Sequence, residues 1–470
     1  MSEEDHFYSN SGNPDELIQR FEEMLKNDDR YFFDADQFEE IIDYYLERNT
    51  FSKAINAIEH AVEIFPDNPG IMLREAQMMA STGKISQAVP KLKTLLKFEA
   101  NNEDALVTLA TIYSQMRKHK EAIVYFREAI NNSQSNFKDE IYIDMAIEYE
   151  SLDQWNKAIE VLKEALTFNS ENETALYELV YCYEETEQSE SCLKFLNDFL
   201  DNHPYSFPAW YNLGNVYQSI GLSEKAIESY DFSIAINDKF GPAYLNKALS
   251  YVKENELHKA IKTYNEVLEF EPPQATLYCY MGECYERLEE NDKAREHYQL
   301  ALDLDPILAD AHVGMGMVND MENQVEAALN CMKKAIDLEP EQADYYLLYG
   351  TMLKRNQRFE EAKKIFERAI TLTNKNLDIW IEYADTHYKT GNIEQSIEVI
   401  EEGLKHNHFS SELSYKKAAF LILSGYKQEG LQLLGLMLAT DFEKSESLFT
   451  DFPELENDPD IVLLYNDFKS

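Results

Sequence analysis

The sequence predicts an all-α protein built as one extended solenoid of about twelve helical hairpins. Three observations carry this prediction. The stretch Phe207 to Lys239 holds two amphipathic segments with apolar residues at helical spacing, separated by a short turn at Gly221. A small residue recurs about every 34 residues along most of the chain. Only 15 Gly and 13 Pro among 470 residues leave little room for long loops.

The register of the hairpins follows from that small residue, which we place in each second helix. Successive positions lie 34 residues apart, except for a step of 36 between Ala122 and Ala158. A small side chain is expected there because two closely crossing helices leave no space for a larger one. The positions are Ala54, Ala88, Ala122, Ala158, Cys192, Ala226, Ala260, Ala294, Ala328, Ala362, Ser396 and Gly430.

Two further positions repeat with the same period. The first helix carries a small partner residue, except at Ile42 and Val180, where we expect slight splaying. The second helix carries a large apolar residue for the groove between the helices. These residues are Ile58, Leu92, Phe126, Leu162, Leu196, Tyr230, Tyr264, Tyr298, Met332, Phe366, Ile400 and Leu434. Second helices are expected to end before Pro66, Pro204, Pro272, Pro306 and Pro340.

A known family shares this pattern. Trp210, Leu213, Gly214 and Tyr217 form a W-x2-L-G-x2-Y motif, and Ala226 follows at the second-helix position. With its 34-residue period, this motif resembles the tetratricopeptide repeat (TPR). The resemblance covers most of the chain. It implies a right-handed superhelix whose concave surface is lined by first helices and holds a peptide or a partner's helix.

Both ends of the array are expected to be capped, because terminal repeats lack a neighbour on one side. Asn13 and Asp458 are predicted N-caps, each followed by a proline. Two extra residues in Asn131 to Asn136 predict a longer loop or a joint. The expected segments are a disordered N-terminus (1–12), an N-terminal capping helix (13–34), repeats one to three (35–136), repeats four to twelve (137–438), and an acidic linker with a C-terminal capping helix (439–470).

The composition limits the classes of partner that the protein is expected to bind. A formal net charge of −44 argues against nucleic acid and against anionic lipid, and it also serves solubility. The polar, acidic N-terminus does not resemble a signal peptide, and the apolar run Ala418 to Leu423 is too short to cross a bilayer. Five cysteines without a C-x2-C pair indicate a reducing compartment. We therefore expect a cytoplasmic monomer, with self-association as an alternative.

The sequence shows no catalytic constellation, so we predict neither an enzyme nor a cofactor. His406 and His408 lack nearby cysteines or a helical H-x3-H partner, so no metal site is expected. Gly314 and Gly316 resemble a glycine-rich loop, but no third glycine follows and both fall inside a first helix. We interpret them as packing residues.

The resemblance also implies which residues line the groove, namely the second, fifth, ninth, twelfth and thirteenth of each first helix, and in some members the sixth. Eight acids at these positions suggest an anionic amino-terminal groove, suited to a Lys- or Arg-bearing partner, or else a merely solvated face. They are Asp36, Glu39, Asp43, Glu47, Glu140, Asp144, Glu184 and Glu185. At the thirteenth position stand the cations Lys253, Arg287, Arg355 and Lys389, which either bind a ligand or pair with neighbouring acids. The expected partner-binding residues are Tyr211, Asn212, Asn215, Leu245, Asn246, Leu249, Lys253, Tyr280, Arg287, Met317, Lys354, Arg355, Tyr388 and Lys389.

These observations predict a non-catalytic scaffold or adaptor that binds protein or peptide partners in the groove. One alternative is a co-chaperone, which in this family grips a C-terminal carboxylate with Lys, Asn and Arg side chains. Asn215 and Asn246 match the two asparagines of that clamp, but Tyr211 occupies the slot of its first lysine. A second alternative is a regulatory or substrate-presenting subunit of a separate enzyme.

Overall fold

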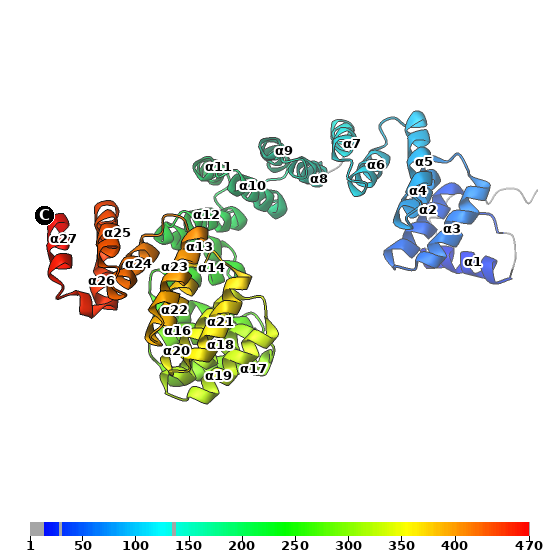
Figure 1. The fold of residues 1–470 in the computed structure, drawn as a ribbon. Helices are drawn as coiled ribbons and strands as arrows, with labels where there is room; N and C mark the ends of the chain where they lie inside the picture. The colour runs from blue at the N-terminus through cyan, green and yellow to red at the C-terminus, as the bar shows by residue number, and fades with distance from the viewer. Residues whose placement is uncertain (1–13, 28–30, 134–137, 470) are drawn as a thin grey trace, which may run out of the picture. The chain divides into compact units, whose positions relative to one another are not determined.

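A computed structural model describes residues 14–27, 31–133 and 138–469 (Figure 1). All regular structure in these ranges is helical, with 27 α-helices and two short 3-10 helices. Twelve consecutive hairpins run from α2 to α25, which confirms the predicted all-α stack of helix pairs. The chain divides into two compact parts, Met1–Ala243 and Tyr244–Ser470, called here the N-terminal and C-terminal parts.

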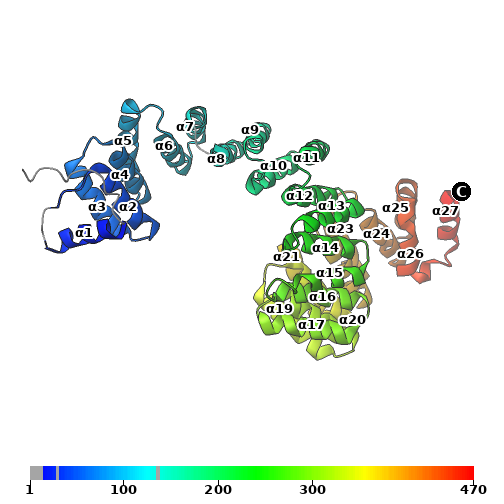
Figure 2. The same cartoon turned by 180° about the vertical axis from the view of Figure 1, so that it is seen from behind.

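The first helices of the hairpins are all thirteen residues long, as the regular register requires (Figure 2). They are α2 (Ala35–Glu47), α4 (Pro69–Ser81), α6 (Glu103–Gln115), α8 (Lys138–Glu150), α10 (Glu173–Glu185), α12 (Phe207–Ser219), α14 (Gly241–Lys253), α16 (Ala275–Arg287), α18 (Ala309–Met321), α20 (Ala343–Arg355), α22 (Leu377–Lys389) and α24 (Ser411–Leu423).

The second helices have fourteen residues, apart from the shorter α15, and they end before the prolines named above. They are α3 (Phe51–Ile64), α5 (Ile85–Phe98), α7 (His119–Asn132), α9 (Trp155–Phe168), α11 (Ser189–Asn202), α13 (Ser223–Ile236), α15 (Leu257–Val267), α17 (Asn291–Leu304), α19 (Val325–Leu338), α21 (Phe359–Leu372), α23 (Ile393–His406) and α25 (Lys427–Thr440).

Helices outside the hairpins stand at both ends. α1 (Pro14–Asn27) packs on α2 through Leu17, Ile18 and Phe21, whereas its expected cap Asn13 lies outside the described residues. The stretch 131–136, where the two extra residues are expected, also lies partly outside the described residues. At the other end, α27 (Pro459–Lys469) begins where predicted. The stretch expected as an acidic linker holds η1 (Phe442–Ser445), α26 (Glu446–Asp451) and η2 (Pro453–Leu455).

In each hairpin, the two helices cross at the small residue of the second helix. Every alanine of the register is buried, and so are Cys192 and Ser396. A Cβ atom on Gly430 would lie 2.8 Å from the Ala418 carbonyl oxygen, which is far inside van der Waals contact. The crossing of the two helices therefore limits the size of this side chain, as the sequence predicted.

In several hairpins, glycine occupies the small first-helix position directly against a bulky ring of the second helix. A Cβ on Gly350 would lie 2.5 Å from the Phe366 ring. The Tyr298 ring is held between two glycines of successive first helices, since a Cβ would lie 2.7 Å from it at Gly282 and 2.1 Å at Gly314. Packing is thus the reason for Gly314, as predicted.

The turn inside each hairpin contains one residue with positive φ. This left-handed residue ends the first helix and lets the next amide bond back to it; Lys84 N–H, for example, donates to the Met79 carbonyl at 2.8 Å. Only four of the twelve are glycine. The positions are Asn49, Gly83, Arg117, Asp153, Glu187, Gly221, Asn255, Glu289, Asn323, Gln357, Gly391 and Gly425.

The packing of the Tyr298 ring between two glycines predicts that Gly314→Ala and Gly435→Ala have opposite effects on stability. Gly314→Ala should lower stability by about 1–3 kcal/mol, because its methyl group overlaps the Tyr298 ring. Gly435→Ala in α25 meets its nearest atom, on Leu464, only at 3.5 Å. It should stabilise the chain by about 0.5–1 kcal/mol through helix propensity. Urea unfolding followed by circular dichroism measures both; equal gains would contradict the packing argument.

Candidate functional site

The candidate site is the first-helix face, defined as the groove-lining positions of the first helices. Neighbouring first helices touch one another within each part, for example α2 with α4, α16 with α18, and α20 with α22. Side chains from one first helix therefore reach the next. The face of the C-terminal part carries most of the residues expected to bind a partner, from Leu245 to Lys389.

Two cations of the predicted row bind the preceding repeat. Arg287 donates to the Val252 carbonyl oxygen at 3.2 Å and to Asn255 Oδ1 at 2.9 Å, at the C-terminal end of α14. Arg355 forms an ion pair with Asp320, whose side chain is only 5% exposed, whereas that of Arg355 is 62% exposed. Both side chains thus connect first helices. In this structure, each of the two arginines binds groups of the chain itself.

Other charges bridge first helices in the same way. Lys354 pairs with Glu382 of the next repeat. Lys416 contacts both carboxylate oxygens of Asp385 in the preceding repeat at 3.1 Å. Sequence reasoning did not select Lys416 or Asp385. Their separation of 31 residues recurs in Arg74 and Asp43, and this spacing is the signal that could have identified both pairs.

The remaining two cations of the row are exposed. Lys253 ends α14 and Lys389 ends α22, and neither forms an ion pair within the described ranges. Their ammonium groups differ in this respect from Arg287 and Arg355. They are the members of the row that remain available to an acidic ligand.

Apolar and aromatic side chains lie on the same face. Leu249 is 37% exposed and Tyr280 is 36% exposed, although the Tyr280 ring stacks on Tyr264 at 5.9 Å. Leu245 and Met317 are half-buried, and so is Asn246, which has polar contacts of its own. The face therefore offers a few accessible apolar contacts between charged groups.

The expected residues of α12 are engaged inside the N-terminal part. Asn212 is 4% exposed, and its amide donates to the Pro208 carbonyl at 2.9 Å, so the structure does not place it at the surface. Asn215 accepts a hydrogen bond from the Tyr230 hydroxyl at 2.9 Å. The Tyr211 ring packs edge-on against Phe240.

The anionic groove expected at the amino-terminal end contains a cation. Arg74 pairs with Asp43 at 2.6 Å and with Glu39 at 2.9 Å, so one positive charge is shared by these two carboxylates. Farther along, α8 and α10 expose carboxylates without ion-pair partners within the described ranges, beside the exposed rings of Tyr177 and Tyr181. The expected acids of these two helices, Glu140, Asp144, Glu184 and Glu185, are therefore exposed, whereas Glu39 and Asp43 share a cation.

Crowded carboxylates mark the first-helix face of α16. Glu283 reaches solvent, but the surrounding protein partly desolvates it. This desolvation, with the nearby Asp310 and Glu286 charges, raises the pKa of Glu283 to about 7. Desolvation also raises the pKa of Glu286, which accepts a hydrogen bond from the Tyr298 hydroxyl at 2.8 Å. Desolvation is thus the main cause of both shifts, and repulsion between acids adds to it at Glu283.

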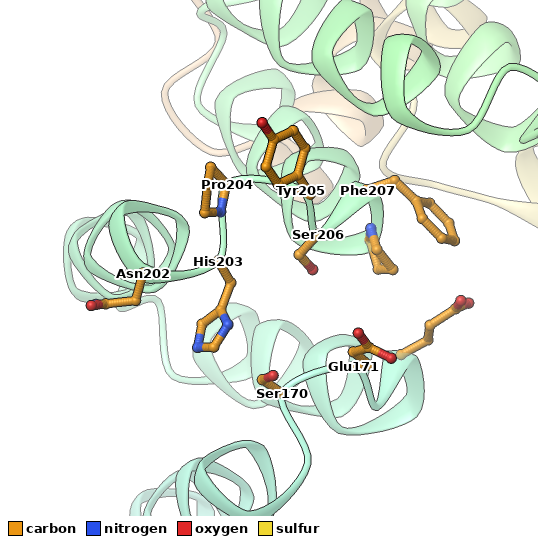
Figure 3. A pocket seen from close by; sticks show the side chains of 10 residues that line it. Ser170, Glu171, Asn202, His203, Pro204, Tyr205, Ser206 and Phe207 are labelled. Atoms are coloured by element: carbon orange, nitrogen blue, oxygen red, sulfur yellow. The ribbon is translucent and has the colours of Figure 1, made fainter.

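A cavity of about 500 Å³ lies elsewhere, in the N-terminal part (Figure 3). It is formed by the loops before α10 and α12 and is lined by Ser170, Glu171, His203 and Tyr205, among others. The His203 ring packs on Phe199 at 4.6 Å. We assign no chemistry to this cavity.

The thiols and histidines do not form a reactive centre in the described ranges. Burial raises the pKa of the Cys284 thiol to about 11 and that of Cys192 to about 12, which keeps both protonated and weakly nucleophilic. Among the described residues, no cluster of three or more His, Cys, Asp or Glu side chains could hold a metal ion. None of the helices there is long and apolar enough to cross a membrane.

Fold and first-helix face together define a helical-repeat protein of the kind that binds other proteins. Sequence models of the tetratricopeptide repeat match residues 103–136, 207–240, 241–274, 275–307, 322–378 and 353–420. The chain belongs to the tetratricopeptide repeat family.

Individual relatives are distant. Human tetratricopeptide repeat protein 7A is 29% identical over 85 residues, which is 18% of this chain and only 10% of that protein. The crystal structure of yeast Tom70 aligns with 93% of this chain and 99% of its own, at 15% identity and a TM-score of 0.47. The APC/C hetero-tetramer Cut9–Hcn1 aligns with 86% of this chain and 98% of its own, at 14% identity and a TM-score of 0.41.

The raised pKa of Glu283 predicts a pH-dependent stability. Folding raises this pKa from 4.5 to about 7, so the cost of ionising Glu283 is absent below the lower value and complete above the higher one. Glu283→Gln should therefore raise the urea midpoint at about pH 8 and change it little at about pH 5. Glu296→Gln, at an exposed carboxylate on α17 of the same repeat, is the control. A pH-independent effect of Glu283→Gln would contradict the assignment.

Proposed function

We propose that the protein is a non-catalytic scaffold that binds an extended peptide or a helix of a partner on the first-helix face of the C-terminal part. The observation that carries this proposal is the combination on that face of accessible Leu249 and Tyr280 with two exposed cations, Lys253 and Lys389, for which the described part of the chain offers no ion-pair partner. Apolar contacts supply affinity, and the charges select the partner.

The charges favour a ligand with carboxylates. Lys253 and Lys389 are exposed at the ends of their first helices, and Arg355 retains a largely exposed guanidinium although it pairs with Asp320. Because the Asp320 side chain is buried, it needs Arg355 as its ion-pair partner. A ligand would have to share the Arg355 guanidinium with Asp320. We therefore assign the electrostatic contact with the ligand to the two lysines.

The co-chaperone alternative has less support. In that branch of the family, asparagine amides hold the carboxylate of the ligand. Here the oxygen of the Asn215 amide accepts a hydrogen bond from Tyr230, within its own repeat. The chain also lacks the first lysine of the clamp, because Tyr211 takes its place. A general peptide-binding scaffold does not require that clamp.

Photo-crosslinking tests the position of the ligand. Peptides of about 12 residues are selected on the full chain from a displayed library, and a photoreactive amino acid replaces Leu249 or Leu300. These two side chains are equally exposed, at 37%, but Leu300 lies on a second helix. Crosslinks should form from position 249 and not from position 300. Crosslinks from position 300 alone, or failure to select any peptide, would contradict the proposal.

Charge is tested separately on the same peptides. Lys253→Ala together with Lys389→Ala should weaken acidic peptides at least about tenfold and reduce the dependence of binding on salt. The matched control, Lys262→Ala with Lys405→Ala, removes two exposed cations from second helices. Equal losses in both double variants would show that net charge, and not the first-helix face, governs binding.

A further inference from the structure

The chain itself occupies part of its first-helix face. The segment Phe442–Leu455, called here the C-terminal segment, comprises η1, α26 and η2 and packs against α24 (Figure 2). It contacts Tyr388 and Lys416 at groove-lining positions of α22 and α24, and also Phe420, which is buried at the tenth position of α24. Tyr388, one of the residues expected to bind a partner, is among them.

The apolar part of this contact centres on one ring. Phe452 is buried, with its ring centroid 5.3 Å from that of Phe420 and 5.7 Å from that of Tyr388, edge-on to both. Leu448 and Leu455 are buried on either side. A phenylalanine in a pocket between two aromatic rings is a typical anchor for a short peptide.

Two acids flank this anchor, and each has a partner on the face. Asp451 Oδ2 accepts from Lys416 Nζ at 2.8 Å, and the same ammonium group lies 5.4 Å from the centroid of the Phe452 ring. Glu454 accepts from the Tyr388 hydroxyl. The segment thus contributes an acid, a phenylalanine and a second acid to the contact, in the order Asp451, Phe452 and Glu454.

The C-terminal segment owes its conformation to this docking. It consists of a six-residue helix between two 3-10 turns, and helices shorter than about 12 residues are marginal in water on their own. The ion pair between Lys416 and Asp385 does not require Asp451, because Lys416 contacts both oxygens of Asp385 directly. Leu448, Phe452 and Leu455 share one hydrophobic core with residues of α22 and α24, so a ligand that displaces the segment must cover the same apolar surface.

We propose that the C-terminal segment is an intramolecular ligand, and that Tyr388, Lys416 and Phe420 form a site for a partner's acidic peptide with a central phenylalanine. This proposal deepens the proposed function, on which it rests, by naming the chemistry that one end of the face accepts. The partner peptide displaces the segment and takes over its contacts with Lys416 and Tyr388.

Competition sets the affinity of this site. A tethered segment acts as a ligand at an effective concentration on the order of millimolar. A free peptide of equal quality therefore binds the wild-type chain weakly, and loosening the segment exposes the site. Asp451→Asn with Glu454→Gln loosens it without leaving a buried charge unpaired, since Lys416 retains Asp385.

The experiment uses the full chain and a labelled peptide of residues 447–456, with binding followed by fluorescence anisotropy. The peptide should bind the loosened double variant at least about tenfold more tightly than the wild type. A peptide with alanine in place of Phe452 should not bind either chain. Circular dichroism and thermal unfolding establish that each variant is folded, and Glu454→Gln alone serves if the double variant is not.

A double-mutant cycle identifies the contact. Tyr388→Phe, made in the loosened chain, keeps the ring but removes the hydroxyl. It should weaken the native peptide and leave unchanged the affinity of a peptide with Ala in place of Glu454, which has no acceptor for the hydroxyl. Additive losses would overturn the assignment of this contact, and with it the site.

Two other outcomes overturn the proposal. Absence of binding to folded wild-type and loosened chains would show that the C-terminal segment is a fixed cap of the last repeat. Dimerisation of the loosened chain in light scattering, without peptide binding, would show that the segment exchanges only between copies. Neither outcome affects crosslinking from position 249, so failure of this site and failure of the proposed function are distinguishable.

Discussion

The close crossing of the two helices in each hairpin is the constraint on which the rest of the structure depends. A side chain as small as alanine is needed on the second helix, and glycine is needed on the first where Phe366 or Tyr298 fills the groove between them. Because interiors are packed at crystal density, a misfit in one hairpin is passed to its neighbours. The near-constant spacing of these residues keeps the helices equal in length and the hairpins superimposable.

The same constraint brings first helices of successive hairpins side by side, so charges on one helix meet charges on the next. The chain has 87 acidic residues and only 43 basic ones, and several cations are committed to these bridges. Arg74, Arg355 and Lys416 each bind a carboxylate of the preceding repeat. Around Glu283, desolvation and the nearby Asp310 and Glu286 charges outweigh the attraction of Arg287 and raise the pKa of the carboxyl group.

At the end of the array, the C-terminal segment covers the last repeat and is also the proposed intramolecular ligand. A last repeat exposes a face that would otherwise be covered by the next one, so some segment must pack there. Here that segment combines buried apolar side chains with acids placed on Lys416 and Tyr388. The same face of the same fold is thereby proposed to stabilise the chain and to select its partner.

The sequence by itself determined the helices, their register and the positions of the small residues, because these depend on local periodicity and on one contact repeated in every hairpin. Gly221 also indicated a turn, although most turns use residues such as Asn255 or Gln357 in the left-handed conformation, which no composition rule reveals. Only the tertiary structure decided that Asn212 is buried, that Arg355 binds Asp320 and that Phe452 docks on Phe420. The contacts of Arg355 and Phe452 join residues of different helices, and they depend on how consecutive elements are packed against each other, which the pattern within one repeat does not contain.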